Sequence, residues 1–192
     1  MILHEPKYVF LDLETTGLDP TFDVILEMGM IITDRELNEL ASFGRTINWP
    51  AIEYNQLTGE YTPPFGVDDF VVRMHENSGL WHDSYRSKYS LTEAINDAAF
   101  WLGQQLFNAS GKLPLAGNNV SFDRVFLQLK DPKFIDLFDY HNFDQSALKI
   151  AYVDWVDGAQ QLPVGNKLHR SIPDCLDSIQ EARFFKKVME AM

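Results

Sequence analysis

The sequence feature that most constrains the fold is the stretch YVFLDLETTGLDP, residues 8–20. It begins as an apolar run typical of a strand buried on both faces, and Asp12 and Glu14 follow just before Thr-Thr-Gly breaks the strand. Successive strand side chains point to opposite faces, so Asp12 and Glu14 share one face. Neighbouring carboxylates repel each other and lose hydration when they are buried, so a compensating group must lie near them.

The rest of the chain alternates between strand and helix patterns. Strands expected at 8–13, 23–34 and 38–49 follow one another closely, which indicates an antiparallel meander. The stretch 49–66 is rich in Pro, Gly and aromatic residues and is predicted to be a long loop. Ser90-Leu-Thr-Glu93 is a capping box that opens a helix. Helices are expected at 67–79, 90–107, 121–130, 145–155 and 172–191, with a short strand at 113–117. This order predicts one α/β domain over 1–192, built on a mixed sheet.

Charge and composition narrow the classes of function. The chain has 16 basic and 28 acidic residues, a formal net charge of −12. This acidity argues against long duplex nucleic acid or a membrane surface as a partner bound through charge alone. No apolar run approaches the roughly 20 residues that span a bilayer, and the N-terminus lacks a signal-peptide core. The single cysteine, Cys175, is expected in the core; it excludes an internal disulfide, which favours the cytoplasm.

Two later segments carry further acidic residues and a histidine. Asp123 lies near the start of an expected helix, where a negative charge also stabilises the helix dipole. His169 precedes Asp174 by five residues, and Ser171-x-x-Asp174 is itself an acceptable capping box. The first pair of carboxylates likewise fits turn and capping roles. Taken alone, each residue therefore has a structural explanation.

Together these residues form the ordered pattern DxE, D and HxxxxD, made of Asp12, Glu14, Asp123, His169 and Asp174. The pattern resembles the DEDDh 3′–5′ exonucleases of the ribonuclease H-like superfamily, and within them the oligoribonuclease group most closely. The resemblance covers about residues 8 to 186. Its segments are FLDLETTGLDP, ILEMGMIITDRELN, RMHENSGL, LAGNNVSFDRVFL, FDQSALK and HRSIPDCLDSIQEARFF. It implies a ribonuclease H-like mixed β-sheet flanked by α-helices.

The resemblance also implies that the four carboxylates hold two Mg²⁺ or Mn²⁺ ions and that His169 is the general base. Carboxylate oxygens suit such hard cations. Two ions about 3.5–4 Å apart activate a water molecule and stabilise the attacking and leaving oxygens of a phosphodiester. A histidine, with an ordinary pKa near 6.5, can accept the water's proton at neutral pH. A metal pair would thus compensate Asp12 and Glu14 and supply positive charge that the acidic chain lacks.

For the substrate, the resemblance implies that Leu18 and Phe70 sandwich terminal bases, that His75 lies beside them and that Tyr140 packs on the substrate. Stacking of bases on aromatic rings tolerates any sequence. Ordinary core packing is the alternative for Leu18 and Phe70.

The chain departs from the family at this substrate site. Phe70 stands where a tryptophan is usual, and Asn119 and His141 stand where a serine and an arginine hold the 5′ phosphate. Ser171 replaces an alanine, Pro173 replaces an acid, and the 49–66 loop looks longer. In the family, a cap over the substrate limits hydrolysis to very short oligomers. These differences predict that the cap is weakened in this chain.

The sequence therefore predicts a metal-dependent 3′–5′ exonuclease that releases nucleoside 5′-monophosphates from short or single-stranded RNA, in preference to DNA. The resemblance implies a homodimer, with the apolar helices 121–130 and 145–155 and Tyr140 as interface material, unless these are buried core. Alternatives are a DNA-directed proofreading or repair exonuclease, a silent nucleic-acid-binding module and an acidic cation-binding protein. The intact catalytic positions argue against the silent module, and His169 argues against a mere cation-binding protein.

Overall fold

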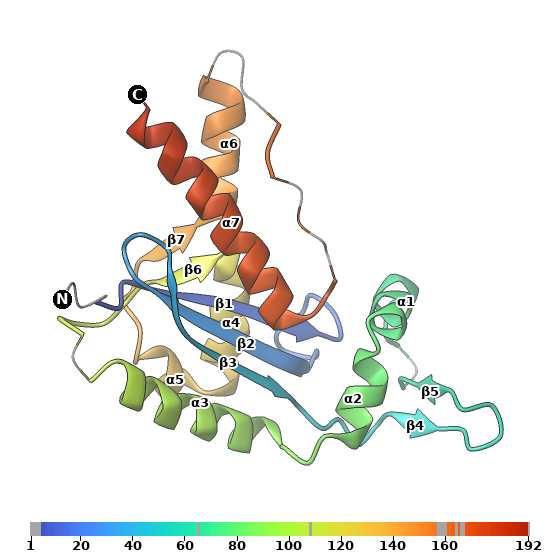
Figure 1. The fold of residues 1–192 in the computed structure, drawn as a ribbon. Coiled ribbons are helices and arrows are strands. Elements are labelled where there is room, and N and C mark those ends of the chain that lie inside the picture. Colours follow the sequence, from blue (N-terminus) through green and yellow to red (C-terminus); the bar gives the residue numbers. More distant parts are fainter. Residues whose placement is uncertain are drawn as a thin grey trace.

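The computed structural model describes residues 5–64, 66–107, 109–156, 161–163, 165 and 168–191. Its centre is a five-stranded mixed sheet in the order β3-β2-β1-β6-β7 (Figure 1). The strands are β1 (Tyr8–Thr15), β2 (Ile25–Thr33), β3 (Glu39–Thr46), β6 (Leu115–Gly117) and β7 (Asn142–Asp144). β1, β2 and β3 pair antiparallel, whereas β6 and β7 extend the sheet in parallel. The predicted meander and the mixed sheet are confirmed.

Seven helices are present in the described part of the chain. They are α1 (Asp69–Asn77), α2 (Leu80–Arg86), α3 (Leu91–Gln105), α4 (Val120–Lys130), α5 (Pro132–Ile135), α6 (Gln145–Trp155) and α7 (Ser171–Glu190). The capping box that opens α3 is confirmed, because Ser90 and Glu93 exchange both hydrogen bonds. Helices α2 and α5 and strand β7 were not predicted. These elements have only three to seven residues, too few to show a clear hydrophobic period.

The expected loop at 49–66 contains a small hairpin, β4 (Glu53–Tyr54) and β5 (Tyr61–Thr62). The Tyr54 and Tyr61 rings stack with their centroids 4.8 Å apart, which holds the two short strands together. The prediction of a long loop therefore missed these two short strands. In Figure 1 the hairpin projects from the sheet beside α1 and α2.

Alternation along β1 divides its side chains between two layers. Val9, Leu11 and Leu13 pack in the core that includes residues of α3 and α4. Phe10 points to the other face, where it packs in a second core cluster with Cys175 and Ile179 of α7. The period of two therefore places Asp12 and Glu14 on the α7 face of the sheet.

Helix α7 lies directly against the sheet at its first turn. Gly29 of β2 pairs with Asp12 across the sheet, and a Cβ atom at Gly29 would lie 2.7 Å from the Ser171 backbone. The absence of a side chain at Gly29 thus lets the start of α7 approach β1 and β2. Among the described residues, no helix combines the length and the hydropathy needed to cross a bilayer.

Candidate active site

Three of the predicted carboxylates converge where β1 meets the first turn of α7. One ligand oxygen from each of Asp12, Glu14 and Asp174 lies within 4.8 Å of the other two. Their strand positions bring Asp12 and Glu14 together, and the approach of α7 at Gly29 brings Asp174 to them. Oxygen donors at this spacing fit a hard divalent cation.

Asp123 reaches the same region from the opposite layer. In the described chain β6 pairs with β1 only at Val9 and Phe10, so the β1 backbone beyond Phe10 needs other partners on that side. The Leu13 N–H donates to Asp123 Oδ1 at 2.9 Å, which fixes the Asp123 carboxylate beside the Asp12–Glu14 segment. Asp123 is also in the first turn of α4, so its charge is favourable for the helix dipole as well.

Burial is the largest cause that raises the pKa values of all four carboxyl groups, and negative charges on neighbouring carboxylates add to the rise. Burial, followed by the negative charge of Asp174, raises the pKa of Glu14 to about 8. Burial also raises the pKa of Asp123 to about 8 and that of Asp174 to about 6. For Asp12, burial and then the Asp123 charge raise the pKa well above its ordinary value. The protein alone therefore balances little of the negative charge that these four groups carry when ionised. This is expected of carboxylates that bind a cation.

The metal-free protein is accordingly expected to be less stable at pH 8.5 than at pH 5.5. The folded-state pKa values of Glu14, Asp123 and Asp174 lie above their ordinary values, so this contribution to stability is complete below about pH 4 and is lost as pH rises through 6 to 8. We expect the melting temperature in EDTA to fall by roughly 5–15 °C between these pH values. Thermal unfolding followed by circular dichroism measures it.

Mn²⁺ at about a hundredfold excess over its Kd should add about 2.7 kcal/mol of stability at pH 8.5, because it binds the ionised folded site. The variant Asp123→Asn serves as the comparison, because it lacks one of the carboxyl groups whose pKa is raised. Both the pH dependence of its melting temperature and its stabilisation by Mn²⁺ should be smaller. A melting temperature that is independent of both pH and Mn²⁺ would contradict a metal site built from these carboxylates.

His169 lies on the segment that leads into α7, five residues before Asp174. Its imidazole is close enough to Asp174 to offset part of the rise in the pKa of that carboxyl. It lines a cleft of about 480 Å³ together with Phe70, Arg73, Met74, Asn77, Ser78 and Leu168. The cleft therefore joins the histidine to one of the predicted base-stacking residues, Phe70.

The capping box that Ser171 and Asp174 could form, the alternative explanation for these residues, is absent from the described structure. Helix α7 begins after Arg170, whose side chain makes no capping bond. The Ser171 N–H instead donates to the Glu27 carboxylate of β2 at 2.8 Å, so a residue from another strand satisfies the helix terminus. This leaves the Asp174 side chain available to face Asp12 and Glu14.

Three of the predicted substrate residues are well exposed. Leu18 is 83% exposed, Phe70 64% and Tyr140 81%, so core packing does not explain Leu18 or Phe70. His75 differs, because its side chain is fully buried. Its Nε2 donates to the Thr15 carbonyl at 2.8 Å and its Nδ1 lies 3.9 Å from Glu14 Oε2. His75 therefore contacts the end of β1 and is covered by protein in this structure.

The two residues expected at the 5′ phosphate also have defined positions. Asn119 has a left-handed backbone, with φ 51°, and precedes α4 with its side chain exposed. Its N–H donates to Asp144 Oδ1 at 3.0 Å. His141 Nδ1 lies 2.7 Å from Asp139 Oδ1, which leaves Nε2 as the ring nitrogen for another partner. The His141 ring packs on Tyr140 with centroids 3.8 Å apart.

Sequence reasoning missed two charged residues that border the site, Glu27 and Arg170. Although burial opposes its ionisation, hydrogen bonds from Arg170 and Ser171 hold the pKa of Glu27 below its ordinary value. The Arg170 guanidinium bonds Glu27 Oε1 at 2.6 Å and Asp83 Oδ2 at 2.8 Å. A signal was present: Glu27 is a charged residue within the apolar strand DVILEMG, and such residues are rarely buried without a partner.

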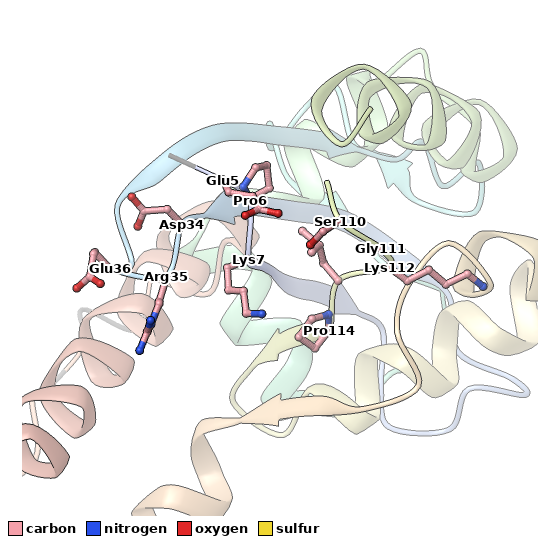
Figure 2. Close-up of a pocket in the computed structure, with 11 residues that line it drawn as sticks. Glu5, Pro6, Lys7, Asp34, Arg35, Glu36, Ser110, Gly111, Lys112 and Pro114 are labelled. Carbon is pink, nitrogen blue, oxygen red and sulfur yellow. The ribbon is translucent and has the colours of Figure 1, made fainter. Parts of the chain in front are cut away.

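A second cavity, of about 420 Å³, lies at the other end of the sheet (Figure 2). It is lined by Lys7, just before β1, by the turn Asp34–Glu36 and by residues 110–114. Lys7 and Glu14 are separated by an extended strand, which at about 3.3 Å per residue puts the cavity roughly 20 Å from the carboxylates. Figure 2 shows Arg35 and Lys112 extending to opposite sides, so the basic groups do not converge on one point. The cavity is separate from the candidate active site.

Residues 9–182 match the RNase_T family model, described as an exonuclease family. The chain belongs to this exonuclease family. It is 34% identical over 179 residues to an oligoribonuclease of Pseudomonas entomophila, with 93% of each chain covered. An oligoribonuclease of Colwellia psychrerythraea is 31% identical over 185 residues, with 96% of each chain covered. The resemblance to oligoribonuclease, expected from the ordered acidic motifs, is confirmed.

Solved exonuclease I structures share the fold of this exonuclease. A zinc-bound complex of E. coli exonuclease I with single-stranded DNA matches with a TM-score of 0.62 and 16% identity, over 98% of this chain and 42% of that one. Exonuclease I from Methylocaldum szegediense gives a TM-score of 0.63 at 16% identity, over 94% of this chain and 40% of that one. The chain thus spans less than half the length of these proteins. The ribonuclease H-like fold, with a mixed sheet flanked by helices, is confirmed.

Proposed function

We propose that this protein is a 3′–5′ exonuclease that hydrolyses short, single-stranded RNA with Mg²⁺ or Mn²⁺ and releases nucleoside 5′-monophosphates. The convergence of Asp12, Glu14 and Asp174 within 4.8 Å carries the proposal, with Asp123 fixed beside them by Leu13. The similarity to oligoribonucleases over 93% of both chains favours RNA over DNA as the substrate. One domain over residues 1–192 and a cytoplasmic location complete the proposal.

Each group in the site has a task in this reaction. Asp12, Glu14, Asp123 and Asp174 hold the cations. Two bound cations supply stabilisation of the negative charge on the attacking and leaving oxygens. His169 accepts the proton of the attacking water from its position in the cleft beside Asp174. His75 donates to the Thr15 carbonyl, which supports the end of the strand that carries Asp12 and Glu14.

Two exposed apolar residues provide the contacts to the bases. Leu18 and Phe70 present the apolar surfaces that terminal bases stack on, and Phe70 lines the same cleft as His169. Asn119, Tyr140 and His141 contact the 5′ part of the substrate. A stacking mode of recognition needs no basic surface, which agrees with the net charge of −12.

The test uses 5′-labelled RNA and DNA of two to twenty-four nucleotides, incubated with Mg²⁺ or Mn²⁺ and resolved by size. We expect stepwise shortening of RNA from its 3′ end. Because Asn119 and His141 replace two phosphate-binding residues, the preference for a 5′-phosphorylated dinucleotide should be relaxed by roughly ten- to a hundredfold. Lys149 and Lys186 are held in ion pairs with Glu181, Glu36 and Glu190, so they offer little compensation.

DNA oligomers of the same sequences are the matched control. Faster hydrolysis of DNA than of RNA would replace the proposal with a DNA-directed exonuclease. Internal cleavage of a circular RNA would contradict exonuclease action. A preference of a thousandfold or more for the dinucleotide would show that other residues restrict the substrate length.

We also propose that the protein is a homodimer. Apolar side chains are exposed on three elements: Val125 and Leu129 on α4, Tyr140 before β7, and Ile150, Val153 and Trp155 on α6. A protein interface is expected to cover exposed apolar side chains where they form one patch. Light scattering is expected to give twice the chain mass of 22.1 kDa. The variant Ile150→Asp should halve the mass, whereas a wild-type mass of one chain would contradict the dimer.

A further inference from the structure

Arg170, the residue that follows His169, is bound by groups from two other elements. Its Nη2 donates to Glu27 Oε1 at 2.6 Å, and its Nε lies 3.2 Å from both oxygens of that carboxylate. Its Nη1 donates to Asp83 Oδ2 of α2 at 2.8 Å. A planar guanidinium with several directed bonds fixes both the position and the orientation of the residue that carries it.

Glu27 is buried and is fully engaged by this arrangement. It lies directly opposite Glu14 in the register of β1 and β2, yet it is outside the group of carboxylates that could share one cation. Its oxygens accept from Arg170, from Thr46 Oγ1 at 3.1 Å and from the Ser171 N–H at 2.8 Å. Glu27 therefore fixes the backbone on the C-terminal side of His169 through both Arg170 and Ser171.

His169 needs such support because its backbone is unusual. It has φ 51°, a left-handed conformation that few residues other than glycine adopt. Such a conformation is strained and persists only where the surrounding structure imposes it. Arg170, the next residue, returns to an extended backbone and is the point at which the segment is bound to β2 and α2.

We infer that Arg170, anchored by Glu27 and Asp83, is a positioning residue that holds the His169 imidazole in the orientation that accepts the water's proton. This inference rests on the proposed function, in which His169 is the general base. The competing explanation is that Arg170 only braces the start of α7, which would affect Asp174 and the fold without a specific effect through His169.

The test compares Arg170→Lys, His169→Ala and the double variant, each shown to be folded by circular dichroism. Lysine keeps the charge opposite Glu27 but cannot form the directed bonds of the guanidinium. We expect Arg170→Lys to lower kcat about 10- to 100-fold, because displacement of a catalytic group by about 1 Å has effects of that size. The KM and the Mn²⁺ affinity measured by calorimetry should stay within about threefold. Arg183→Lys, whose guanidinium donates to the Leu37 carbonyl in the turn at the far end of the sheet, is the matched control and should keep wild-type kcat.

The double variant separates the two explanations. If Arg170 acts through His169, Arg170→Lys in the His169→Ala background should change kcat by less than about twofold. If Arg170→Lys lowers kcat by the same factor in that background as in the wild type, or weakens Mn²⁺ binding tenfold, the inference is overturned. Arg170 then only braces the start of α7. If Arg170→Lys does not fold, Asp83→Asn takes its place, with an expected threefold to tenfold fall in kcat. Its effect in the His169→Ala background then decides between the two explanations in the same way.

The outcomes also separate this inference from the proposed function. If His169→Ala itself keeps wild-type kcat, then His169 is not the base, and the proposed role of His169 fails. If His169→Ala loses activity while Arg170→Lys keeps it, only the positioning role fails.

Discussion

Replacement of Asp123 by asparagine is expected to lower kcat by about 10³-fold or more. Asparagine has nearly the same shape, and its side-chain oxygen can still accept the Leu13 N–H that Asp123 accepts at 2.9 Å. The substitution therefore removes one negative charge and one anionic ligand with little other change. Loss of a bound cation costs several kcal/mol of charge stabilisation in the transition state, and each 1.36 kcal/mol is a factor of ten in rate.

The measurement is single-turnover hydrolysis of a labelled RNA oligomer, with Mn²⁺ binding followed by calorimetry. Asp34→Asn is the matched control, since Asp34 is another buried carboxylate but lies at the far end of the sheet, beside the cavity of Figure 2. It should keep wild-type kcat. Wild-type turnover by Asp123→Asn would show that α4 contributes no metal ligand and that Asp123 serves only the Leu13 backbone and the helix terminus.

His169→Ala is expected to lower kcat by roughly 10²–10⁴-fold, the usual contribution of a general base. KM and Mn²⁺ affinity should change little, because the side chain takes part in proton transfer and not in holding metal or substrate. Steady-state kinetics with a short RNA oligomer measure this.

Imidazole added to the solution distinguishes a base from a structural residue. It should restore part of the activity of His169→Ala, because a free imidazole can accept the water's proton in the space that the side chain vacates. The same addition should leave Asp123→Asn unchanged, since that variant lacks a metal ligand. Wild-type turnover by His169→Ala, or a loss that accompanies weaker Mn²⁺ binding, would contradict the role of His169 as the base.

Local patterns in the sequence were sufficient to predict the elements that carry the candidate site. Strand alternation placed Asp12 and Glu14 on one face, and in the structure that face is the one covered by α7. The capping box at Ser90 marked the start of α3 correctly. The short elements α2, α5 and β7 were missed because three to seven residues do not establish a period.

Partners between distant segments could not be read from the sequence. Ser171 and Asp174 fit a local capping box, but Glu27, 144 residues away, accepts the Ser171 N–H instead. His75 was expected to lie beside the bases, whereas its side chain is fully buried and contacts the Thr15 carbonyl at the end of β1. In both cases the local pattern was compatible with two environments, and the tertiary contacts determine which of them forms.

The sequence by itself determined the type, order and strand face of the acidic residues, because backbone geometry fixes where neighbouring side chains point. It also determined the family, through motifs matched along residues 9–182. Only the tertiary structure decided the use of each carboxylate. Glu14 and Glu27 are opposite each other in the sheet, yet Arg170 engages Glu27 and leaves Glu14 with Asp12 and Asp174. The reason is electrostatic: a buried carboxylate takes its role from the charges that folding brings within a few ångströms of it, and those charges come from distant parts of the chain.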